Sequence, residues 1–196
     1  MNVLENLYTR RTIRKFKPDP VTDEQVRTII DAARWAPNAG NFQPWEFIII
    51  RNPKAINKIR EMFQASVKVS HLTLPEGHPY RIAREEKLRK GVYDDYYLGA
   101  TVFIAVFVDP EKTDSPIQDG SAAIENMMLA AWSLGLGSAW LDTIPQDEIK
   151  RLLEAPKKLK FIACIPVGYP SEIPAPPPRK SLDEIVYYEK YTRKQH

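Results

Sequence analysis

The sequence predicts a single domain in which α-helices and β-strands are mixed. Three short apolar runs have the length and composition of strands, and stretches with apolar residues every three or four positions flank them. At 196 residues, the chain is long enough to bury a substantial core. We find neither an internal repeat nor a clear linker, so residues 1–196 are expected to form one domain. Strands are expected at 46–50, 102–108 and 159–168, and helices at 2–8, 22–33, 118–135 and 146–154.

Composition narrows the function classes. Apolar residues make up 43% of the chain and charged residues 27%, and the net charge is +3. These values are typical of a globular protein and give no reason to expect binding to nucleic acid or to a membrane. No apolar segment approaches about 18 residues and no signal-peptide core is present, so we expect a cytoplasmic protein. Cys164 lies in an apolar run, which favours a buried, inert thiol, and His71 and His78 lack metal-ligand spacing.

Two helix starts carry explicit capping signals. Thr22 is followed three residues later by Gln25, which is the pattern of a capping box. Asn52 precedes Pro53, which combines an N-cap side chain with a proline at the first helical position. Helices are therefore expected to begin directly after Thr22 and after Asn52.

A basic run follows the first expected helix. Five of the eight residues from Arg10 to Lys17 are basic. In an extended segment, side-chain alternation puts Arg10, Thr12 and Arg14 on one face. Two guanidinium groups beside a hydroxyl can form an anion site, because guanidinium binds phosphate through paired hydrogen bonds. The alternative is an ordinary solvated run of charge.

The loop at 36–45 organises the chain around it. Proline disfavours a helical residue before it, so Pro37 should end the preceding helix and Pro44 should start the next strand in an extended conformation. Between the two prolines, apart from Phe42, the side chains are small or carry amides, and none is charged. Such a loop can bring its backbone close to a flat, polar ligand. A plain connection between helix and strand is the alternative.

Residues 66–98 differ from the rest of the chain. Seven of the ten residues 81–90 are charged, and Tyr93, Tyr96 and Tyr97 follow. This composition is typical of a surface excursion outside the core. We expect a partly helical segment that forms a variable lid over a pocket.

Two features suggest contact with a second copy of the chain. The helix at 118–135 is rich in small residues and apolar over much of its circumference, so it should be buried on more than one side. It could pack against its copy in a dimer or lie at the centre of a monomer. The proline-rich tail should be stiff and extended, and apolar residues follow it. Residues 174–196 are therefore expected to form a C-terminal arm that docks on a partner subunit.

Four motifs in this order and spacing resemble the nitroreductase family of flavoproteins. Each is weak alone, but together they span nearly the whole chain. They are Arg10-Arg11-Thr12-Ile13-Arg14-Lys15-Phe16, Ala36-Pro37-Asn38-Ala39-Gly40-Asn41-Phe42-Gln43-Pro44-Trp45, Gly135-Leu136-Gly137-Ser138-Ala139-Trp140-Leu141, and Gly168-Tyr169-Pro170 with Pro178-Arg179-Lys180. The resemblance implies an α+β fold with a mixed central β-sheet flanked by helices. It also implies a homodimer that exchanges its C-terminal arm and holds one FMN in each of two interface sites.

The resemblance implies contacts at the phosphate end of the cofactor. Arg10, Thr12 and Arg179 would hold the FMN phosphate. Arg11 would contact the phosphate or the ribityl chain. Arg14 would reach the pyrimidine edge of the flavin. A guanidinium there favours the negative charge of reduced flavin.

It also implies contacts around the flavin ring. Residues of the other subunit would line the flavin, namely Pro37, Asn38, Ala39, Asn41 and Gln43. Backbone groups near N5 and O4 of the flavin would come from Trp140, Leu141 and Asp142. Asp142 departs from the family pattern, which often has glycine there, and its side chain could change the shape and charge beside the flavin.

The function implied is that of an FMN-dependent NAD(P)H oxidoreductase. NADH or NADPH would reduce the flavin and leave, and a small-molecule acceptor such as a nitroaromatic or a quinone would enter the same pocket. This order gives ping-pong kinetics. Because the flavin performs the hydride chemistry, no catalytic side chain is expected. The alternatives are a specialised relative that carries out reductive dehalogenation or flavin breakdown, and a flavin-binding redox module without turnover.

Overall fold

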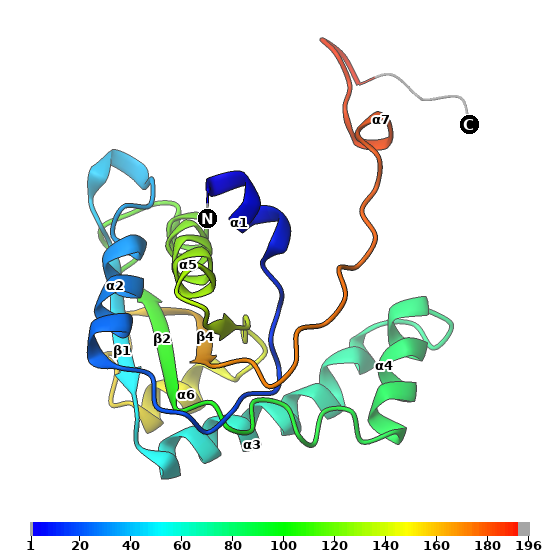
Figure 1. The fold of residues 1–196 in the computed structure, drawn as a ribbon, viewed down its shortest axis with the longest axis horizontal. Coiled ribbons are helices and arrows are strands. Elements are labelled where there is room, and N and C mark those ends of the chain that lie inside the picture. The colour runs from blue at the N-terminus through cyan, green and yellow to red at the C-terminus, as the bar shows by residue number, and fades with distance from the viewer. Residues whose placement is uncertain (1, 192–196) are drawn as a thin grey trace.

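The computed structural model describes residues 2–191, and a four-stranded β-sheet lies at their centre (Figure 1). Met1 and residues 192–196, the end of the predicted arm, lie outside the described residues. The strand order is β1-β2-β4-β3, and all three pairings are antiparallel. The strands are β1 (Trp45–Ile50), β2 (Val102–Val108), β3 (Gly137–Ser138) and β4 (Lys160–Gly168).

Helices and this sheet together confirm the predicted α+β class. The three predicted strands begin within one residue of the observed ones. The sheet is mixed only in a narrow sense, because its ladders are antiparallel. Within residues 2–191 the parallel pairing is a single bridge between Thr12 and Ser138, at the edge formed by β3.

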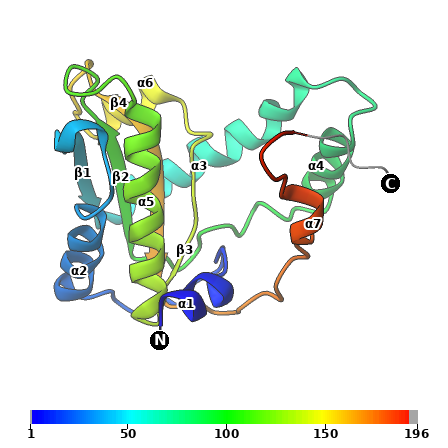
Figure 2. The same ribbon diagram turned by 90° about the horizontal axis from the view of Figure 1, so that it is seen from above.

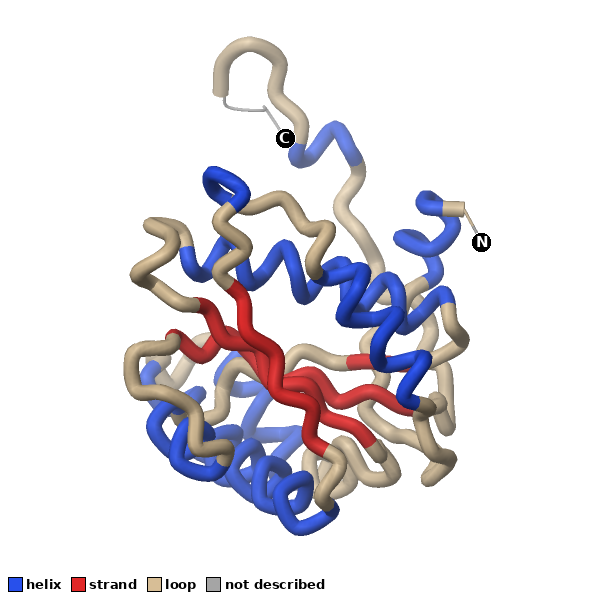
Figure 3. Tube along the Cα trace, turned by 90° about the vertical axis from the view of Figure 1, so that its left-hand side faces the viewer, coloured by secondary structure: helices blue, strands red, loops and turns tan. Residues whose placement is uncertain are grey.

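Alternation along β2 divides the core into two layers, and Figure 3 shows helices on both faces of the sheet. Val102, Ile104, Val106 and Val108 pack with the apolar residues of α2 (Asp23–Ala33) and α5 (Pro116–Ser133). Phe103, Ala105 and Phe107 pack with those of α3 (Pro53–Ser70) and α6 (Gln146–Leu152). Every residue of β2 is buried, as predicted for a central strand.

The capping signals hold in the structure. The Thr22 hydroxyl accepts a hydrogen bond from the Gln25 backbone N–H at 3.2 Å, and the Gln25 side chain accepts one from the Thr22 N–H at 3.0 Å. The Asn52 side chain accepts a hydrogen bond from the Lys54 N–H at 2.9 Å, and Pro53 is the first residue of α3. Local sequence therefore sets where α2 and α3 begin.

Helix α5 is covered on more than one side within a single chain. It packs on the sheet and on α2, and α1 (Val3–Thr9) lies near its C-terminal end (Figure 2). Every residue from Asp119 to Trp132 is buried or half-buried. Gly120 allows the close approach to the sheet, since a Cβ there would lie 2.6 Å from the side chain of Ile162. Within residues 2–191, no helix has both the length and the apolar character needed to span a membrane.

The expectation that residues 66–98 lie outside the core is wrong at both ends of the segment. Helix α3 continues to Ser70, and a short 3₁₀ turn, η2 (His71–Thr73), follows it. Val67, His71 and Tyr97 are buried. The excursion proper contains α4 (Pro79–Arg89), which has no buried residue and stands away from the sheet (Figures 1 and 2).

The C-terminal part of the chain leaves the body of the molecule in an extended course that holds only the short helix α7 (Leu182–Ile185) among its described residues (Figure 1). Several large apolar side chains on it are exposed, namely Leu182, Ile185, Tyr188 and Tyr191. This extended course agrees with the stiffness that its prolines predict.

The basic run is joined to the end of the excursion by backbone hydrogen bonds. The Tyr97 N–H donates to the Arg14 carbonyl at 2.6 Å, and the Phe16 N–H donates to the Leu98 carbonyl at 3.1 Å. Gly99 makes this crossing possible, because it has a φ of +80° and a Cβ there would lie 2.1 Å from the Phe16 carbonyl oxygen. The crossing fixes where Arg14 lies relative to the tyrosines.

We expect Gly99→Ala to destabilise the protein by about 3 kcal/mol, because it adds both left-handed strain and backbone overlap. Thermal unfolding should then show a midpoint about 6–12 °C below that of the wild type. Gly77→Ala is the matched control, since a Cβ at Gly77 meets nothing within 4 Å. Equal midpoints for the two variants would show that the crossing is not under this constraint.

Candidate functional site

Two adjoining cavities of about 410 Å³ each lie beside the edge of the sheet, and Arg14 and Tyr96 line both. Their volumes are those of small-molecule sites. The lid cavity lies between α4 and residues 140–143. Its other lining residues are Phe63, Tyr80, Ala83, Arg84, Lys87, Tyr93, Tyr97, Trp140, Asp142 and Thr143. The basic-run cavity is lined by Thr12, Lys15, Lys90, Gly91, Val92, Asp95, Glu172 and Pro174 as well.

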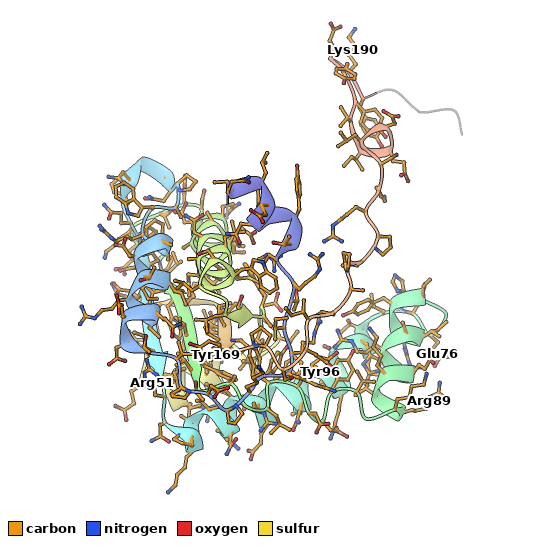
Figure 4. All side chains as sticks on the ribbon, viewed as in Figure 1. Arg51, Glu76, Arg89, Tyr96, Tyr169 and Lys190 are labelled. Carbon is orange, nitrogen blue, oxygen red and sulfur yellow. The ribbon has the colours of Figure 1, made fainter. Side chains whose placement is uncertain are left out.

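Aromatic rings form one wall of the lid cavity. The Phe63 ring centroid lies 5.1 Å from that of Tyr97, 6.3 Å from that of Tyr96 and 6.4 Å from that of Tyr93. The Arg14 guanidinium lies 5.4 Å from the Tyr96 ring centroid, in cation–π geometry. Figure 4 shows Tyr96 between the body of the molecule and α4.

Burial raises the pKa of the Tyr97 phenol, and the nearby Arg14 guanidinium opposes the shift less strongly. Burial also raises the pKa of Tyr93. Both phenols therefore stay protonated at neutral pH and keep a proton to donate to a ligand.

The structure brings some of the predicted cofactor residues together at these cavities. Thr12 and Arg14 share the basic-run cavity, but Lys15 lines it too and Arg10 does not, so simple side-chain alternation does not describe this segment. Trp140 and Asp142 line the lid cavity. Leu141 between them is buried, and its N–H donates to the Cys164 carbonyl at 3.1 Å. Its backbone N–H is therefore committed to the sheet.

The other two arginines of the basic run do not line either cavity. The Nε atom of Arg10 lies 3.9 Å from the Glu125 carboxylate on α5. Its Nη1 atom is buried and has no hydrogen-bond partner among residues 2–191. Arg11 folds back on the end of α1, where its Nη1 donates to the carbonyls of Tyr8 and Arg10, each at 2.8 Å.

Cys164 faces the core and not a cavity. Its side chain is completely buried, and this burial raises the pKa of the thiol. The thiolate is therefore disfavoured, in agreement with the inert thiol predicted from the sequence.

The loop at 36–45 has a tightly determined backbone. Gly40, Asn41 and Gln43 are all left-handed, with φ of 54°, 55° and 49°. The Asn38 side chain accepts a hydrogen bond from the Gln43 N–H at 2.8 Å. Pro37 is exposed. Left-handed residues other than glycine are uncommon and cluster at functional sites, which favours a ligand-contacting loop over a plain connection.

Asp119 holds this loop in place, and sequence reasoning did not find it. The residue is buried, and its carboxylate accepts hydrogen bonds from the Ala39 N–H at 3.2 Å and from the Thr113 hydroxyl at 2.7 Å. In the sequence Asp119 is an acidic residue in the first turn of a helix, which is unremarkable. Nothing in the pattern links it to a loop 80 positions away.

A single chain does not gather all the predicted residues. The loop meets α5 at Asp119, whereas the Asn6 side chain of α1 donates to the Leu129 carbonyl at 2.9 Å. These two points on α5 are about 15 Å apart at helical rise. Arg179 lies on the extended C-terminal course, where its nearest polar contacts are the carbonyls of Pro177 and Pro178 at 3.4 and 3.3 Å.

We expect Asp119→Ala to cost about 2 kcal/mol, because it leaves the Thr113 hydroxyl and the Ala39 N–H without their partner. The midpoint of thermal unfolding should fall by about 4–8 °C. Asp114→Ala, in the segment before α5, is the control, since Asp114 is exposed and its carboxylate accepts a hydrogen bond from the neighbouring Ser115 hydroxyl at 3.0 Å. If both variants unfold at the wild-type temperature, Asp119 does not hold the loop.

The comparisons with known proteins place the chain in a family. The model of the nitroreductase family matches residues 7–169, so the chain belongs to that family of FMN-dependent oxidoreductases. Proteins of Methanothermobacter thermautotrophicus and Archaeoglobus fulgidus share the provisional name NADH dehydrogenase/NAD(P)H nitroreductase. The first is 35% identical over 181 residues, which are 89% of this chain and 80% of the relative. The second is 32% identical over 177 residues, which are 86% of each.

Other similar proteins have more specialised names. Iodotyrosine deiodinase 1 of Rattus norvegicus is 29% identical over 194 residues, covering 93% of this chain and 67% of the relative. A crystal structure of oxidized iodotyrosine deiodinase bound to FMN and 3-iodo-L-tyrosine has a TM-score of 0.83 at 25% identity, covering 97% of this chain and 100% of the other. A BluB-like flavoprotein from Clostridium difficile 630 has a TM-score of 0.75 at 27% identity, with the same coverage.

Proposed function

We propose that this protein binds FMN and uses NADH or NADPH to reduce small acceptors such as nitroaromatics or quinones. The observation that carries the proposal is the pair of adjoining cavities with Arg14 between them. Support comes from the similar fold of a deiodinase that binds FMN, and from the relatives named as NAD(P)H nitroreductases.

The residues present fit such a cofactor in their chemistry. The Nη1 atom of Arg10 and the Oγ1 atom of Thr143 are buried and lack a hydrogen-bond partner among residues 2–191, and Thr143 lines the lid cavity. A buried polar atom without a partner costs about 1–3 kcal/mol. A ligand rich in phosphate and ring oxygens would remove this cost.

FMN would supply the hydride chemistry, and the side chains would bind and orient it. Arg10, Thr12 and Arg179 would hold the phosphate, with Arg11 at the phosphate or the ribityl chain. Arg14 would reach the pyrimidine edge of the ring. Contacts to the ring would come from Pro37, Asn38, Ala39, Asn41, Gln43, Trp140, Leu141 and Asp142. The Leu141 N–H already donates to the Cys164 carbonyl. A backbone N–H near N5 or O4 of the flavin would therefore come from Trp140 or Asp142.

A homodimer would complete this site. The loop at 36–45 and Arg179 both lie away from Arg10 and Thr12 within one chain. A second copy, packed so that its loop and its C-terminal arm reach the first chain, would supply them. The exposed apolar side chains of the arm fit this arrangement, because contact with a partner would remove them from water.

Three alternatives stay open on the same fold, of which two are specialised reactions and one is a redox module. The similarity to iodotyrosine deiodinase supports a specialised reductive dehalogenation. Flavin breakdown is the other specialisation; a 5,6-dimethylbenzimidazole synthase of Rhodospirillum rubrum is 29% identical over 177 residues and shows that relatives with further specialised names exist. A flavin-binding module without turnover is also compatible with the two cavities.

The experiment that tests the proposal begins with the absorbance spectrum of the purified protein and its reduction by each pyridine nucleotide. We expect a yellow protein that NADH or NADPH reduces, and parallel double-reciprocal lines with a nitroaromatic or quinone acceptor. A colourless protein that takes up no FMN on reconstitution would exclude the proposal. Flavin binding without acceptor turnover would identify a redox module instead.

We expect Arg179→Ala to weaken FMN binding about ten- to a hundredfold, because a charged hydrogen bond contributes about 1.5–3 kcal/mol. Lys180→Ala is the control on the adjacent residue of the arm. Binding is measured by fluorescence titration of the apoprotein, and mass by sedimentation. A full-length monomer that holds FMN would contradict the shared site, and an Arg179→Ala variant that binds FMN as tightly as the wild type would contradict the role of Arg179.

A further inference from the structure

We propose that the lid cavity selects aromatic molecules that carry a negative charge, such as aromatic carboxylates. The inference rests on the proposed function, because it specifies which acceptors that site would take. It is carried by the charges on α4, by the aromatic lining of the cavity and by the position of Arg14.

The cations on and next to α4 differ in their ion pairs. Arg81 pairs with Glu85 at 2.9 Å, and Lys90, which follows the helix and lines the basic-run cavity, pairs with Glu86 at 2.6 Å. Arg84 and Lys87 line the lid cavity instead. Neither has a carboxylate within 4.0 Å among residues 2–191. The two cations of α4 that face the lid cavity therefore have no counter-charge within ion-pair distance among the described residues.

Arg84 is oriented by aromatic contacts that leave its charge in place. Its guanidinium lies 5.0 Å from the Tyr80 ring centroid and 5.3 Å from that of Tyr93, and one of its nitrogens donates to the Tyr80 hydroxyl. Stacking on rings holds the planar guanidinium but supplies no anion. A free N–H edge is thus available to a carboxylate, which it can bind through paired hydrogen bonds.

The charges around the whole cavity are unbalanced. Arg14, Arg84 and Lys87 are positive, and Asp142 is the carboxylate in the lining. The roles proposed for FMN use Arg14 but neither residue of α4. An excess of positive charge therefore faces the part of the cavity left for a second ligand. The remaining lining is largely aromatic, so an anionic ring would use both features of the wall.

The test compares three ligands of nearly equal size: 2-naphthoate, 2-naphthamide and 2-naphthylmethylamine. Their affinities for the protein as purified are measured by calorimetry at low salt, with the flavin absorbance recorded before each titration. We expect 2-naphthoate to bind at least tenfold more tightly than the amide, and the preference to shrink as salt screens the cations. Affinities within threefold of each other, or tightest binding of the amine, would overturn the proposal.

Variants of α4 separate charge from shape. Arg84→Gln and Lys87→Gln should each reduce the naphthoate preference at least threefold, and Arg84→Lys should retain most of it. Arg89→Gln is the matched control, because Arg89 lies on the same helix outside the lining, on its outer side (Figure 4). An unchanged preference in both glutamine variants would overturn the proposal.

The outcomes also separate this inference from the proposed function. A yellow, turning-over enzyme without the naphthoate preference would exclude only the anionic class. A colourless protein would exclude the proposed function, while the preference, measured on the same sample, would still decide whether the cavity selects anions.

Discussion

The complete burial of β2 determines the architecture of this protein. A strand with apolar residues on both faces requires a helical layer on each side, and α2 with α5 and α3 with α6 provide them. The space between the sheet and each helical layer is then filled by side chains, which leave no room for a ligand. The cavities lie instead beyond the edge, where β3 has two residues and Thr12 bridges to Ser138. The site is thus where regular pairing ends.

Strand alternation continues past that edge and supplies the cavity lining. Leu141 returns to pair with Cys164, which directs it into the core and turns its neighbours Trp140 and Asp142 to the lid cavity. In the segment after β3, Leu141 is therefore held in the sheet, and Trp140 and Asp142 on either side of it face the lid cavity. This makes the Asp142 carboxylate a rigidly placed negative charge opposite the cations of α4.

Sequence reasoning succeeded where the determining contacts are local. The capping pairs at Thr22 and Asn52 act within three residues, and the apolar run of β2 specifies its own burial. It failed where contacts join distant segments. Tyr97 looked like part of a polar excursion, yet it is 3% exposed because its backbone pairs with Arg14. The Asp119 clamp on the loop at Ala39 was missed for the same reason, since tertiary pairing leaves no local pattern.

Arg14 connects the two halves of the candidate site. Its carbonyl is fixed by the Tyr97 N–H, its guanidinium rests on Tyr96, and both cavities share it. Helix α4 has no buried residue, and the Arg81 hydrogen bond to the Leu74 carbonyl at 2.9 Å ties its first turn to the preceding segment. The Arg81–Glu85 ion pair stabilises this exposed helix, whereas Arg84 and Lys87, which face the lid cavity, have no carboxylate within 4.0 Å among residues 2–191.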